Sequence, residues 1–481
     1  MDYEAVIGLE VHAQLLTRTK IFCACSTEFG APPNTHVCPV CLGLPGSLPV
    51  LNREVVTKAV KTALALDLTI NPESIWERKH YFYPDLPKGY QISQLALPLA
   101  ERGRLEIMTS QGPRTIGITR LHLEEDAGKL VHSEDAFSSA RSSFVDLNRA
   151  GTPLMEIVSD PDLRTPEEAG AYLRALRDIL VYLEVCDGNM EEGSLRCDAN
   201  VSARLRGEKK LGTRTELKNM NSFRNVERAL EFEVKRQIRL LEAGKQVARE
   251  TRLWDEKEGK TRPMRGKEES HDYRYFPDPD LLPLLVNQDW IEQARAALPE
   301  LPMQKRARFV RDYALPEADA GVLVADRALA DYYEAVVKEG ADPKKAANWI
   351  MAELLRELKD EGAGIAACRV KPSQLAAMIR MIDAGEITGK IGKTVFAEMC
   401  RTGEDPAAII EDKGLKPVAD AGEIERWCRQ AVADNPKQVE QYRAGKTKVM
   451  GFFVGQVMKA SSGKADPAQV NDLLKKLLAE E

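Results

Sequence analysis

Four short stretches of the chain alternate between apolar and polar residues, the pattern of a β-strand with one buried and one polar face. In residues 6–15, for example, Glu10 and His12 alternate with Leu9 and Val11. The same alternation occurs in residues 118–126, 194–202 and 214–218. Because alternate side chains of a strand lie on the same face, each polar set is expected on one side of a sheet.

These polar faces carry carboxylates, imidazoles and cations instead of the Thr, Ser and Lys of an ordinary solvated sheet face. They comprise Glu10, His12, Arg120, His122, Glu124, Asp126, Arg196, Asp198, Arg214, Glu216 and Lys218. One such strand is more often solvated than catalytic, but four strands with an acid on each favour a site. Acids of this kind bind divalent metal, and the cations bind phosphate.

Helical periodicity divides the rest of the chain. A capping box, Thr165–Glu168, predicts a helix start, and a second helix is expected between Ser222 and Gly244. Residues 256–280 are polar and are predicted to form a long functional loop. After Pro283 the strand patterns cease and helical periods dominate, as in residues 346–358 and 374–382.

We therefore expect an α+β protein of three domains. Residues 1–290 are predicted to form a cradle of mostly antiparallel sheet with helices. Residues 291–405 are predicted to form an all-α domain, and residues 406–481 a small helical tail. A chain of 481 residues is too long for a single core, which supports this division.

Composition excludes several classes of protein. Hydrophobic content of 43% and charged content of 30% are ordinary for a soluble globular chain, and no apolar run reaches membrane-spanning length. No targeting segment is evident at the start, so a cytoplasmic location is expected. The net charge of −6 offers no global attraction to nucleic acid. Residues 435–464, with six cations and one acid, form a local basic segment or simply a solvated helical face.

Four of the nine cysteines lie close together in the sequence. Cys23, Cys25, Cys38 and Cys41 form a C-x-C and a C-x-x-C pair, which can offer four thiolates to a tetrahedral zinc ion. A pair of disulfides is the competing interpretation, which a reducing compartment disfavours. The spacing leaves no open coordination position, so the zinc is predicted to be structural.

Familiar catalytic motifs are absent from the sequence. Residues 389–394 approach a phosphate-binding loop, but the glycine spacing is wrong, and we interpret them as a turn between helices. The motifs of zinc proteases, α/β-hydrolases and dinucleotide-binding folds are missing, and no amidase serine motif or thiol suited to a glutaminase is present. The chain is therefore not expected to release ammonia from glutamine by itself.

Several collinear blocks resemble the GatB family, the B subunits of tRNA-dependent amidotransferases. They are Gly8–Leu15, Pro39–Gly46, Lys79–Gln91, His122–Lys129, Asp146–Leu154, Arg214–Asn219, His271–Asp280 and Gly451–Lys459, the last similar to the family's YqeY-type tail. The resemblance spans nearly the whole chain. It implies an N-terminal cradle similar in fold to glutamine synthetase.

The resemblance also implies a function. The family uses ATP to phosphorylate the side-chain carboxylate of Glu-tRNA(Gln), and often of Asp-tRNA(Asn), and then amidates it with ammonia. Ammonia comes from the amidase subunit GatA, and the small subunit GatC completes a heterotrimer. Implied cofactors are ATP, Mg²⁺ and structural Zn²⁺, and no membrane association is implied. The sequence leaves open which of the two tRNAs is used.

Chemistry and resemblance together suggest roles for individual residues. Predicted Mg²⁺ ligands or their supports are Glu10, His12, Glu124, Glu125 and Glu216. Predicted ATP- and phosphate-binding residues are Arg196, Asp198, Arg214 and Lys218. Lys79 and Lys88 flank an aromatic loop near the expected ammonia entry, with Lys88 paired to Glu125. Predicted tRNA-binding residues are Tyr273, Arg274, Tyr275, Lys446, Lys448 and Lys459.

Each assignment has a structural alternative. The cations can pair with neighbouring acids, the lysines can be solvated, and the tyrosines can pack under their loop. Two rival functions follow: a zinc-containing tRNA-binding scaffold without catalysis, and a free-standing ligase acting on small glutamate. The helical tail argues against the second rival, since a small substrate would not need it.

Overall fold

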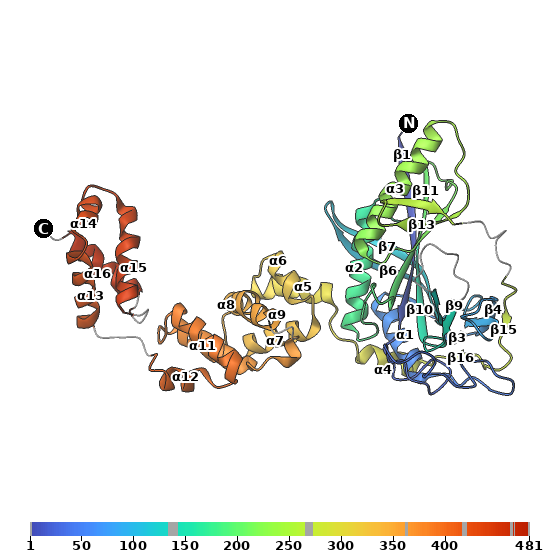
Figure 1. The fold of residues 1–481 in the computed structure, drawn as a ribbon, viewed down its shortest axis with the longest axis horizontal. Coiled ribbons are helices and arrows are strands. Elements are labelled where there is room, and N and C mark those ends of the chain that lie inside the picture. Colours follow the sequence, from blue (N-terminus) through green and yellow to red (C-terminus); the bar gives the residue numbers. More distant parts are fainter. Residues whose placement is uncertain are drawn as a thin grey trace. The chain divides into compact units, whose positions relative to one another are not determined.

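The computed structural model describes residues 2–132, 143–264, 273–360, 364–415, 421–461, 465 and 467–479. His271, Asp272 and Lys464, which belong to predicted motifs or to the basic segment, lie outside these residues. The chain divides into two compact units, Met1–Leu301 and Pro302–Glu481. The first combines a large sheet with helices and the second is helical, so the predicted α+β class is confirmed (Figure 1).

A nine-stranded sheet forms the centre of the first unit. Its strand order is β14-β13-β12-β11-β1-β10-β7-β6-β2. Neighbouring strands are antiparallel except for β12 and β13, which are parallel. The bounds are β1 (Tyr3–Gln14), β2 (Thr69–Ile70), β6 (Ala100–Thr109), β7 (Gly112–Glu125), β10 (Pro153–Ser159), β11 (Leu195–Leu205), β12 (Thr215–Lys218), β13 (Thr251–Asp255) and β14 (Lys260–Pro263). The four predicted strands are β1, β7, β11 and β12.

Three small sheets lie beside the large one. Their pairings are β15-β4-β5, β16-β3 and β8-β9. The bounds are β3 (Glu73–Ser74), β4 (Glu77–His80), β5 (Tyr90–Ser93), β8 (Lys129–His132), β9 (Ser143–Asp146), β15 (Phe276–Pro277) and β16 (Leu284–Leu285). Two expectations are corrected here. Residues 256–280 contain strands β14 and β15, so they are not only a loop. A further strand, β16, follows Pro283 and pairs with β3.

The described residues of the first unit also form the helices α1 (Arg53–Ala65), α2 (Pro166–Tyr182), α3 (Phe223–Glu242) and α4 (Gln288–Ala296). The predicted capping box is present, since Thr165 accepts the N–H of Glu168 and Glu168 reaches back to the N–H of Thr165. The predicted second helix is α3, which begins after its cap Ser222. Both helix starts therefore follow from local sequence alone.

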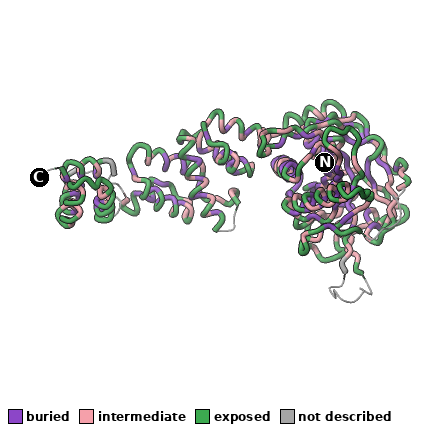
Figure 2. The backbone as a smooth tube through the Cα atoms, turned by 90° about the horizontal axis from the view of Figure 1, so that it is seen from above, coloured by how far each residue is buried: buried purple, intermediate pink, exposed green. Residues whose placement is uncertain are grey.

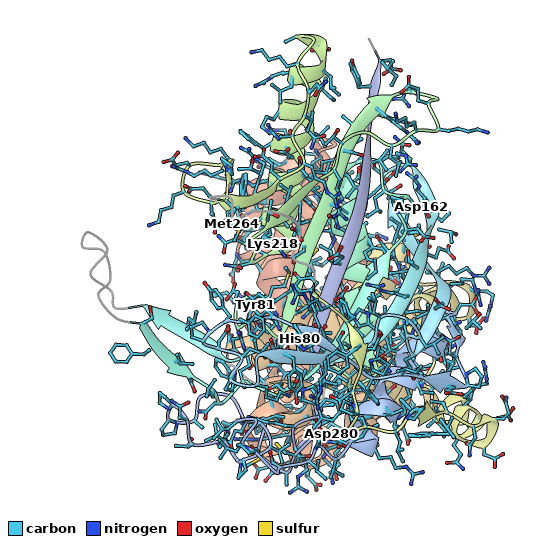
Figure 3. The ribbon with its side chains drawn as sticks, turned by 90° about the vertical axis from the view of Figure 1, so that its right-hand side faces the viewer. His80, Tyr81, Asp162, Lys218, Met264 and Asp280 are labelled. Atoms are coloured by element: carbon cyan, nitrogen blue, oxygen red, sulfur yellow. The ribbon has the colours of Figure 1, made fainter. Side chains whose placement is uncertain are left out.

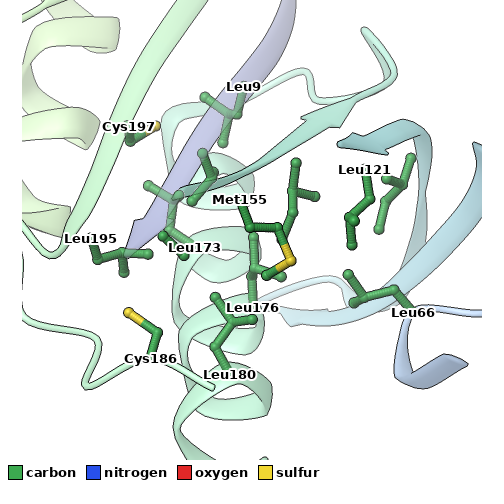
Figure 4. Packing of buried hydrophobic residues seen from close by; sticks show 14 of the residues in the cluster. Leu9, Leu66, Leu121, Met155, Leu173, Leu176, Leu180, Cys186, Leu195 and Cys197 are labelled. Carbon is green, nitrogen blue, oxygen red and sulfur yellow. The ribbon is translucent and has the colours of Figure 1, made fainter. Parts of the chain in front are cut away.

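The core of this unit lies between the sheet and α2. Leu173, Leu176 and Leu180 of α2 face Leu9 of β1 and Met155 of β10 (Figure 4). Each of these side chains is at most 1% exposed. This packing commits the apolar residues of β1, β10 and β11 to one face of the sheet, so the alternate residues must lie on the other face.

The second unit contains helices and two separate apolar clusters. Its helices are α5 (Pro302–Tyr313), α6 (Glu317–Leu323), α7 (Arg327–Lys338), α8 (Pro343–Trp349), η1 (Ile350–Leu354), α9 (Leu355–Asp360), η2 (Ile365–Ala367), α10 (Pro372–Asp383), α11 (Gly389–Thr402), α12 (Pro406–Asp412), α13 (Ala421–Ala433), α14 (Pro436–Arg443), η3 (Thr447–Val449), α15 (Met450–Ala460) and α16 (Pro467–Ala479). One cluster runs from Phe309 to Ile410 and the other from Ile424 to Leu478. Buried positions lie inside each helical group (Figure 2). The predicted boundaries at 290 and 405 stay predictions.

The segment 389–394 is the beginning of α11, so its interpretation as a turn is wrong. Thr388 caps the helix by accepting the N–H of Ile391, and both glycines tolerate helical geometry. A Cβ at Gly392 would lie 2.7 Å from Ile382 Cδ1, so a larger residue there would need the end of that side chain to move. None of the helices in the described parts of the chain combines the length and apolar character that a membrane span requires.

Replacing Leu176 with alanine tests the core against which the site is built. Because Leu176 is fully buried between α2 and the sheet, L176A is expected to lower the free energy of unfolding by about 2–5 kcal/mol. Hydrogen exchange of α2 amides during a urea titration measures the loss. L211A, at a 52% exposed leucine, is the control and is expected to change it by less than about 0.5 kcal/mol. Equal losses in the two variants would contradict this core.

Candidate functional site

The register of four central strands places a row of polar residues across one face of the sheet. His12 of β1 lies opposite Arg196 of β11 on one side and opposite Glu156 of β10 on the other. Glu156 in turn lies opposite His122 of β7. The row therefore runs Arg196, His12, Glu156, His122, and Glu124 follows His122 two residues along β7.

Two histidines and two glutamates in this region form a compact cluster, which we call the acid–imidazole cluster (His12, His122, Glu124 and Glu156). His12 Nε2 lies 3.2 Å from Glu156 Oε2 and 3.9 Å from Glu124 Oε1. His122 Nε2 lies 3.5 Å from Glu156 and 3.9 Å from Glu124. One ligand atom each from His12, Glu124 and Glu156 lie within 4.8 Å of one another, close enough to hold one metal ion.

Burial and charge act against each other in this cluster. Burial lowers the pKa of His12, but the hydrogen bond and the charge of Glu156 more than offset this, so the pKa is raised. Burial raises the pKa of Glu156, but the charges of His122 and His12 hold it far below its ordinary value. The pKa of Glu124 is lowered by its hydrogen bond with His122 against the effect of burial. Both carboxylates are therefore ionised at neutral pH and available as ligands.

A second group of predicted acids lies on the same face, toward β12. Glu10 of β1 is opposite Asp198 of β11, and Asn200 of β11 is opposite Glu216 of β12. Asn200 Nδ2 donates to Glu10 Oε1 at 2.8 Å. Lys218 forms ion pairs with Asp198 and with Glu216, the latter at 3.1 Å (Figure 3 labels Lys218).

The charges in this second group are unequally compensated. Burial and the charge of Glu156 raise the pKa of Glu10. Burial also raises the pKa of Glu216, but the charge of Lys218 and a 2.7 Å hydrogen bond from Thr251 Oγ1 bring it below its ordinary value. The neighbouring acids raise the pKa of Lys218 despite its burial. Glu10 is therefore the acid of this group that an added cation would stabilise most.

The small sheet β15-β4-β5 brings a lysine and two tyrosines to this region. Burial lowers the pKa of Lys79, but the charge of Glu124 raises it above its ordinary value. Lys79 Nζ lies 4.9 Å from the ring centroid of Tyr273, which contacts Tyr275 edge-on. Arg274 is exposed, and its carbonyl contacts the ring of His80, labelled in Figure 3. Lys79 is thus held as a cation and is unsuited to act as a neutral base.

The remaining predicted phosphate-binding residues differ in their surroundings. Arg196 Nη2 contacts Asp126 Oδ2 at 2.5 Å, and Gln14 donates to the same oxygen at 2.8 Å. Arg214 precedes β12 and is exposed, although its charge still helps to lower the pKa of Glu216. Arg196 is therefore partly engaged by an acid, whereas Arg214 lies at the margin of the site.

Glu125 points away from the acid–imidazole cluster, because it follows Glu124 in β7 and adjacent residues of a strand face opposite sides. It pairs with Lys88, which confirms the predicted contact. The carboxylate also accepts the N–H of Ile92 at 2.9 Å, and Gln91 Nε2 donates to the backbone carbonyl of Glu125 at 2.7 Å. The described geometry thus places Glu125 with Lys88 and apart from the other four predicted magnesium ligands.

The four clustered cysteines converge in space. Sulfur atoms of Cys23, Cys25, Cys38 and Cys41 all lie within 4.8 Å of one another. This fits tetrahedral zinc, whose Zn–S bonds of about 2.3 Å place the sulfurs closer than that. None of the four forms a disulfide. Lys20, which is fully buried nearby, helps to lower the pKa of Cys41 to about 4, although the hydrogen bond with Cys23 is the larger cause.

The predicted tRNA-binding lysines of the tail belong to the second unit. Lys446, Lys448 and Lys459 are exposed. Lys446 and Lys448 line a surface concavity together with Phe452, whose ring is 39% exposed and contacts Phe453 edge-on. An exposed aromatic ring beside cations is an arrangement typical of surfaces that bind single-stranded nucleic acid.

Two residues of the acid–imidazole cluster were not among the predicted site residues. Glu156 is the one charged residue in the otherwise apolar strand Pro153–Ser159, and a lone acid in a buried strand is the signal that points to it. His122 belongs to a polar strand face recognised in the sequence, but no feature of the sequence distinguishes it from the other polar residues of that face. Its Nδ1 atom is buried without a hydrogen-bond partner among the described residues.

Comparison with known proteins assigns the chain to a family. Residues 5–292 match the family model described as the GatB/GatE catalytic domain. Residues 331–478 match a second model, described as the GatB domain. The chain belongs to the GatB family. The resemblance predicted from sequence blocks is therefore confirmed.

GatB relatives from several bacteria are similar over their full length. One from Syntrophotalea carbinolica is 59% identical over 479 residues, covering 100% of this chain and 99% of the relative. One from Desulfotalea psychrophila is 58% identical over 478 residues, covering 99% of this chain and 100% of the relative. Both are named as the B subunit of an aspartyl/glutamyl-tRNA(Asn/Gln) amidotransferase.

The cysteine cluster predicts that the purified chain carries about one zinc ion. Mutating residues that only support metal ligands lowers metal affinity by about 10–100-fold. Because C38S removes a ligand itself, it is expected to lower the affinity for zinc by more than that. Metal analysis and competition with a chromogenic chelator measure the change. C368S is the control, since Cys368 lies outside the cluster and donates to the carbonyl of Val370. Full zinc retention by C38S would refute the assignment.

Proposed function

We propose that this GatB chain is the kinase and amide-forming component of a multi-subunit tRNA-dependent amidotransferase. Its substrates are ATP, ammonia and a glutamate or aspartate side chain carried on tRNA. The relatives' shared name, the B subunit of an aspartyl/glutamyl-tRNA(Asn/Gln) amidotransferase, supports the reaction and implies partner subunits. The amidase subunit GatA and the small subunit GatC, forming a heterotrimer with this chain, are the proposed partners. The cytoplasmic location expected from the sequence stays a prediction.

The observation that carries this proposal is the acid–imidazole cluster with cations around it. Phosphoryl transfer needs positioning and charge neutralisation more than covalent help from the protein. Lys79 lies close enough to Glu124 for each charge to shift the pKa of the other residue. Lys218 is held as a cation by Asp198 and Glu216. These residues give this face of the sheet acids and cations suited to divalent metal and polyphosphate.

The residues of the cluster fit a magnesium ion. His12, Glu124 and Glu156 converge on one point, and both carboxylates are ionised. Glu10 is the nearest acid with an uncompensated charge, which fits a second or shared ion. When bound, magnesium would help to neutralise the charge of the phosphates. Because Mg²⁺ prefers oxygen, His12 is proposed to orient a metal-bound water, with Glu124 and Glu156 as direct ligands.

In the first step, a carboxylate oxygen of the tRNA-borne side chain attacks the γ-phosphorus of ATP. The bond to the bridging oxygen breaks, which gives an acyl phosphate and ADP. Lys79, Lys218, Arg196 and Arg214 are proposed to hold the phosphate oxygens and oppose the charge that develops on them. Asp198 positions Lys218 through their ion pair. Phosphate is then a good leaving group where oxide was not.

In the second step, ammonia attacks the acyl carbon, the C–O bond to phosphate breaks, and the amide forms. Ammonium must first lose a proton, so a carboxylate at the entry is useful. Glu125 is proposed for this role with Lys88 as its ion-pair partner. Lys79 is unsuited to it because its pKa is raised. Tyr273, Arg274 and Tyr275 are proposed to stack on the tRNA terminus beside the acceptor site.

Replacing Glu156 with glutamine separates catalysis from a scaffold role. E156Q keeps the size of the side chain but removes the charge that faces His12 and His122. Phosphate release from ATP, measured in the purified complex with Glu-tRNA and without glutamine, is expected to fall about 100-fold or more. Mn²⁺ binding, followed by electron spin resonance, is expected to weaken in parallel.

E231Q is the matched control, since Glu231 is an exposed acid of α3 and its ion pair with Lys235 lies on the surface. It is expected to behave like the wild-type chain. If the wild-type complex releases no more phosphate than E156Q, the zinc-containing scaffold replaces the ligase as the function. If E156Q releases phosphate at the wild-type rate, the acid–imidazole cluster is not the reaction site.

The tail lysines are proposed to bind the tRNA backbone. Reversing two exposed charges in K446E/K448E is expected to raise the KM for aminoacyl-tRNA about tenfold, with kcat unchanged, because phosphate contacts are lost but the reaction pocket is not altered. Steady-state kinetics at two salt concentrations measure this effect. K475E is the control, since Lys475 of α16 is equally exposed but lies outside the basic segment. An equal rise in KM for K475E would contradict a specific tail contact.

A further inference from the structure

The cysteine cluster and the Lys88–Glu125 pair line the same cavity. This cavity, of about 200 Å³, is bordered by Cys23 and Cys41 as well as by Lys88 and Glu125. The side chains of Lys88 and Glu125 are only 9% and 3% exposed. A site interpreted as structural therefore lies directly beside a charged pair proposed for the ammonia entry.

Gly43 connects the two features. It lies two residues after Cys41, in a loop closed by backbone hydrogen bonds. The N–H of Gly43 donates to the carbonyl of Val40 at 3.0 Å, and the N–H of Leu44 donates to that of Pro39 at 2.9 Å. Gly43 has φ +68°, the left-handed region that favours glycine. The loop that presents Cys41 thus also fixes the position of Gly43.

Gly43 packs directly against Lys88. A Cβ built on Gly43 would lie 2.3 Å from Lys88 Cγ and 3.1 Å from both Cα and Cβ of the same residue. Rotation of the lysine side chain could relieve the first contact but not the others, because Cα belongs to the backbone. The absence of a side chain at Gly43 is therefore what allows the cysteine loop to lie against the backbone of Lys88.

The position of Lys88 is in turn coupled to Glu125 and its surroundings. The Lys88 ammonium group pairs with Glu125 and lies 5.3 Å from the ring centroid of Tyr90. The same carboxylate oxygen of Glu125 accepts the N–H of Ile92. Displacing Lys88 therefore disturbs the carboxylate, and the exchange rate of the Ile92 amide reports that disturbance.

We propose that the metal-binding cysteine loop is a positioning element for Lys88, so that zinc binding fixes the geometry of the Lys88–Glu125 pair through Gly43. The donor set fits zinc, since the four sulfurs converge without forming disulfides. The proposal takes from the proposed function only that this pair stands at the ammonia entry. Its test does not depend on tRNA, ATP or catalysis.

G43A tests this coupling in the full-length chain. Hydrogen exchange of the Ile92 amide, measured by mass spectrometry, is expected to become about tenfold faster than in the wild type, because its charged acceptor is displaced. G46A is the matched control: Gly46 has φ +84° in the same loop, but a Cβ there meets nothing within 4 Å. G46A is expected to show wild-type exchange at Ile92. Removing zinc from the wild-type chain with a chelator is expected to reproduce the G43A effect.

Equal exchange at Ile92 in G43A and G46A would overturn the proposal, as would unchanged exchange after zinc removal. If G43A is too unstable to purify alone, the comparison of G43A/K88A with K88A replaces it. K88A removes the atom 2.3 Å from the added Cβ, so G43A is expected to lower the unfolding temperature less in this background than in the wild type, measured in cell lysate. Equal losses in both backgrounds would show that the added methyl group does not meet Lys88, and the coupling would fail.

Discussion

The polar face of the nine-stranded sheet depends on pairing buried or partly buried acids with neighbouring basic side chains. An ionised carboxylate removed from water is costly unless an opposite charge lies beside it. Glu156 meets this condition with His12 and His122, Asp198 with Lys218, and Asp126 with Arg196. The exception is Glu10, where burial and neighbouring acids raise the pKa. A carboxylate such as Glu10, which among the described residues lacks a cationic partner on a surface where the other acids have one, is suited to bind a cation.

This arrangement is possible because the opposite face of the same strands is committed to the core. Leu9, Met155 and their neighbours pack against α2, which removes any freedom for the strands to slip by one residue. A slip would exchange the two faces and bury His12 and Glu156 in hydrocarbon. The apolar core and the proposed reaction site are thus two consequences of one register, and a mutation that loosens α2 would also disorder the charges.

Local sequence was sufficient to predict much of this structure, but not the contacts between distant segments. Alternation identified four strands, and the capping box at Thr165 identified the start of α2. Glu156 was not predicted as a site residue, because it meets the two histidines only when β10 lies between β1 and β7. The periodicity of a sequence does not give the order of strands in a sheet. Glu125 was grouped with Glu124 by adjacency in sequence, although a strand turns neighbouring side chains to opposite sides. The start of α11 was misread because its glycines suggested a turn, although both lie in helical backbone.

The two edge strands of the large sheet affect how other chains can assemble with this one. On one margin, β2 consists of only Thr69 and Ile70, and on the other, β14 carries Lys260 and Arg262 and ends at Pro263. A short strand, charged side chains and a proline all discourage another polypeptide from extending a sheet by hydrogen bonding along its border. Among the described residues, these two end strands are therefore poor templates for strand addition. At these two ends, partner chains are expected to dock through side chains, which leaves the hydrogen-bonding register of the central strands undisturbed by assembly.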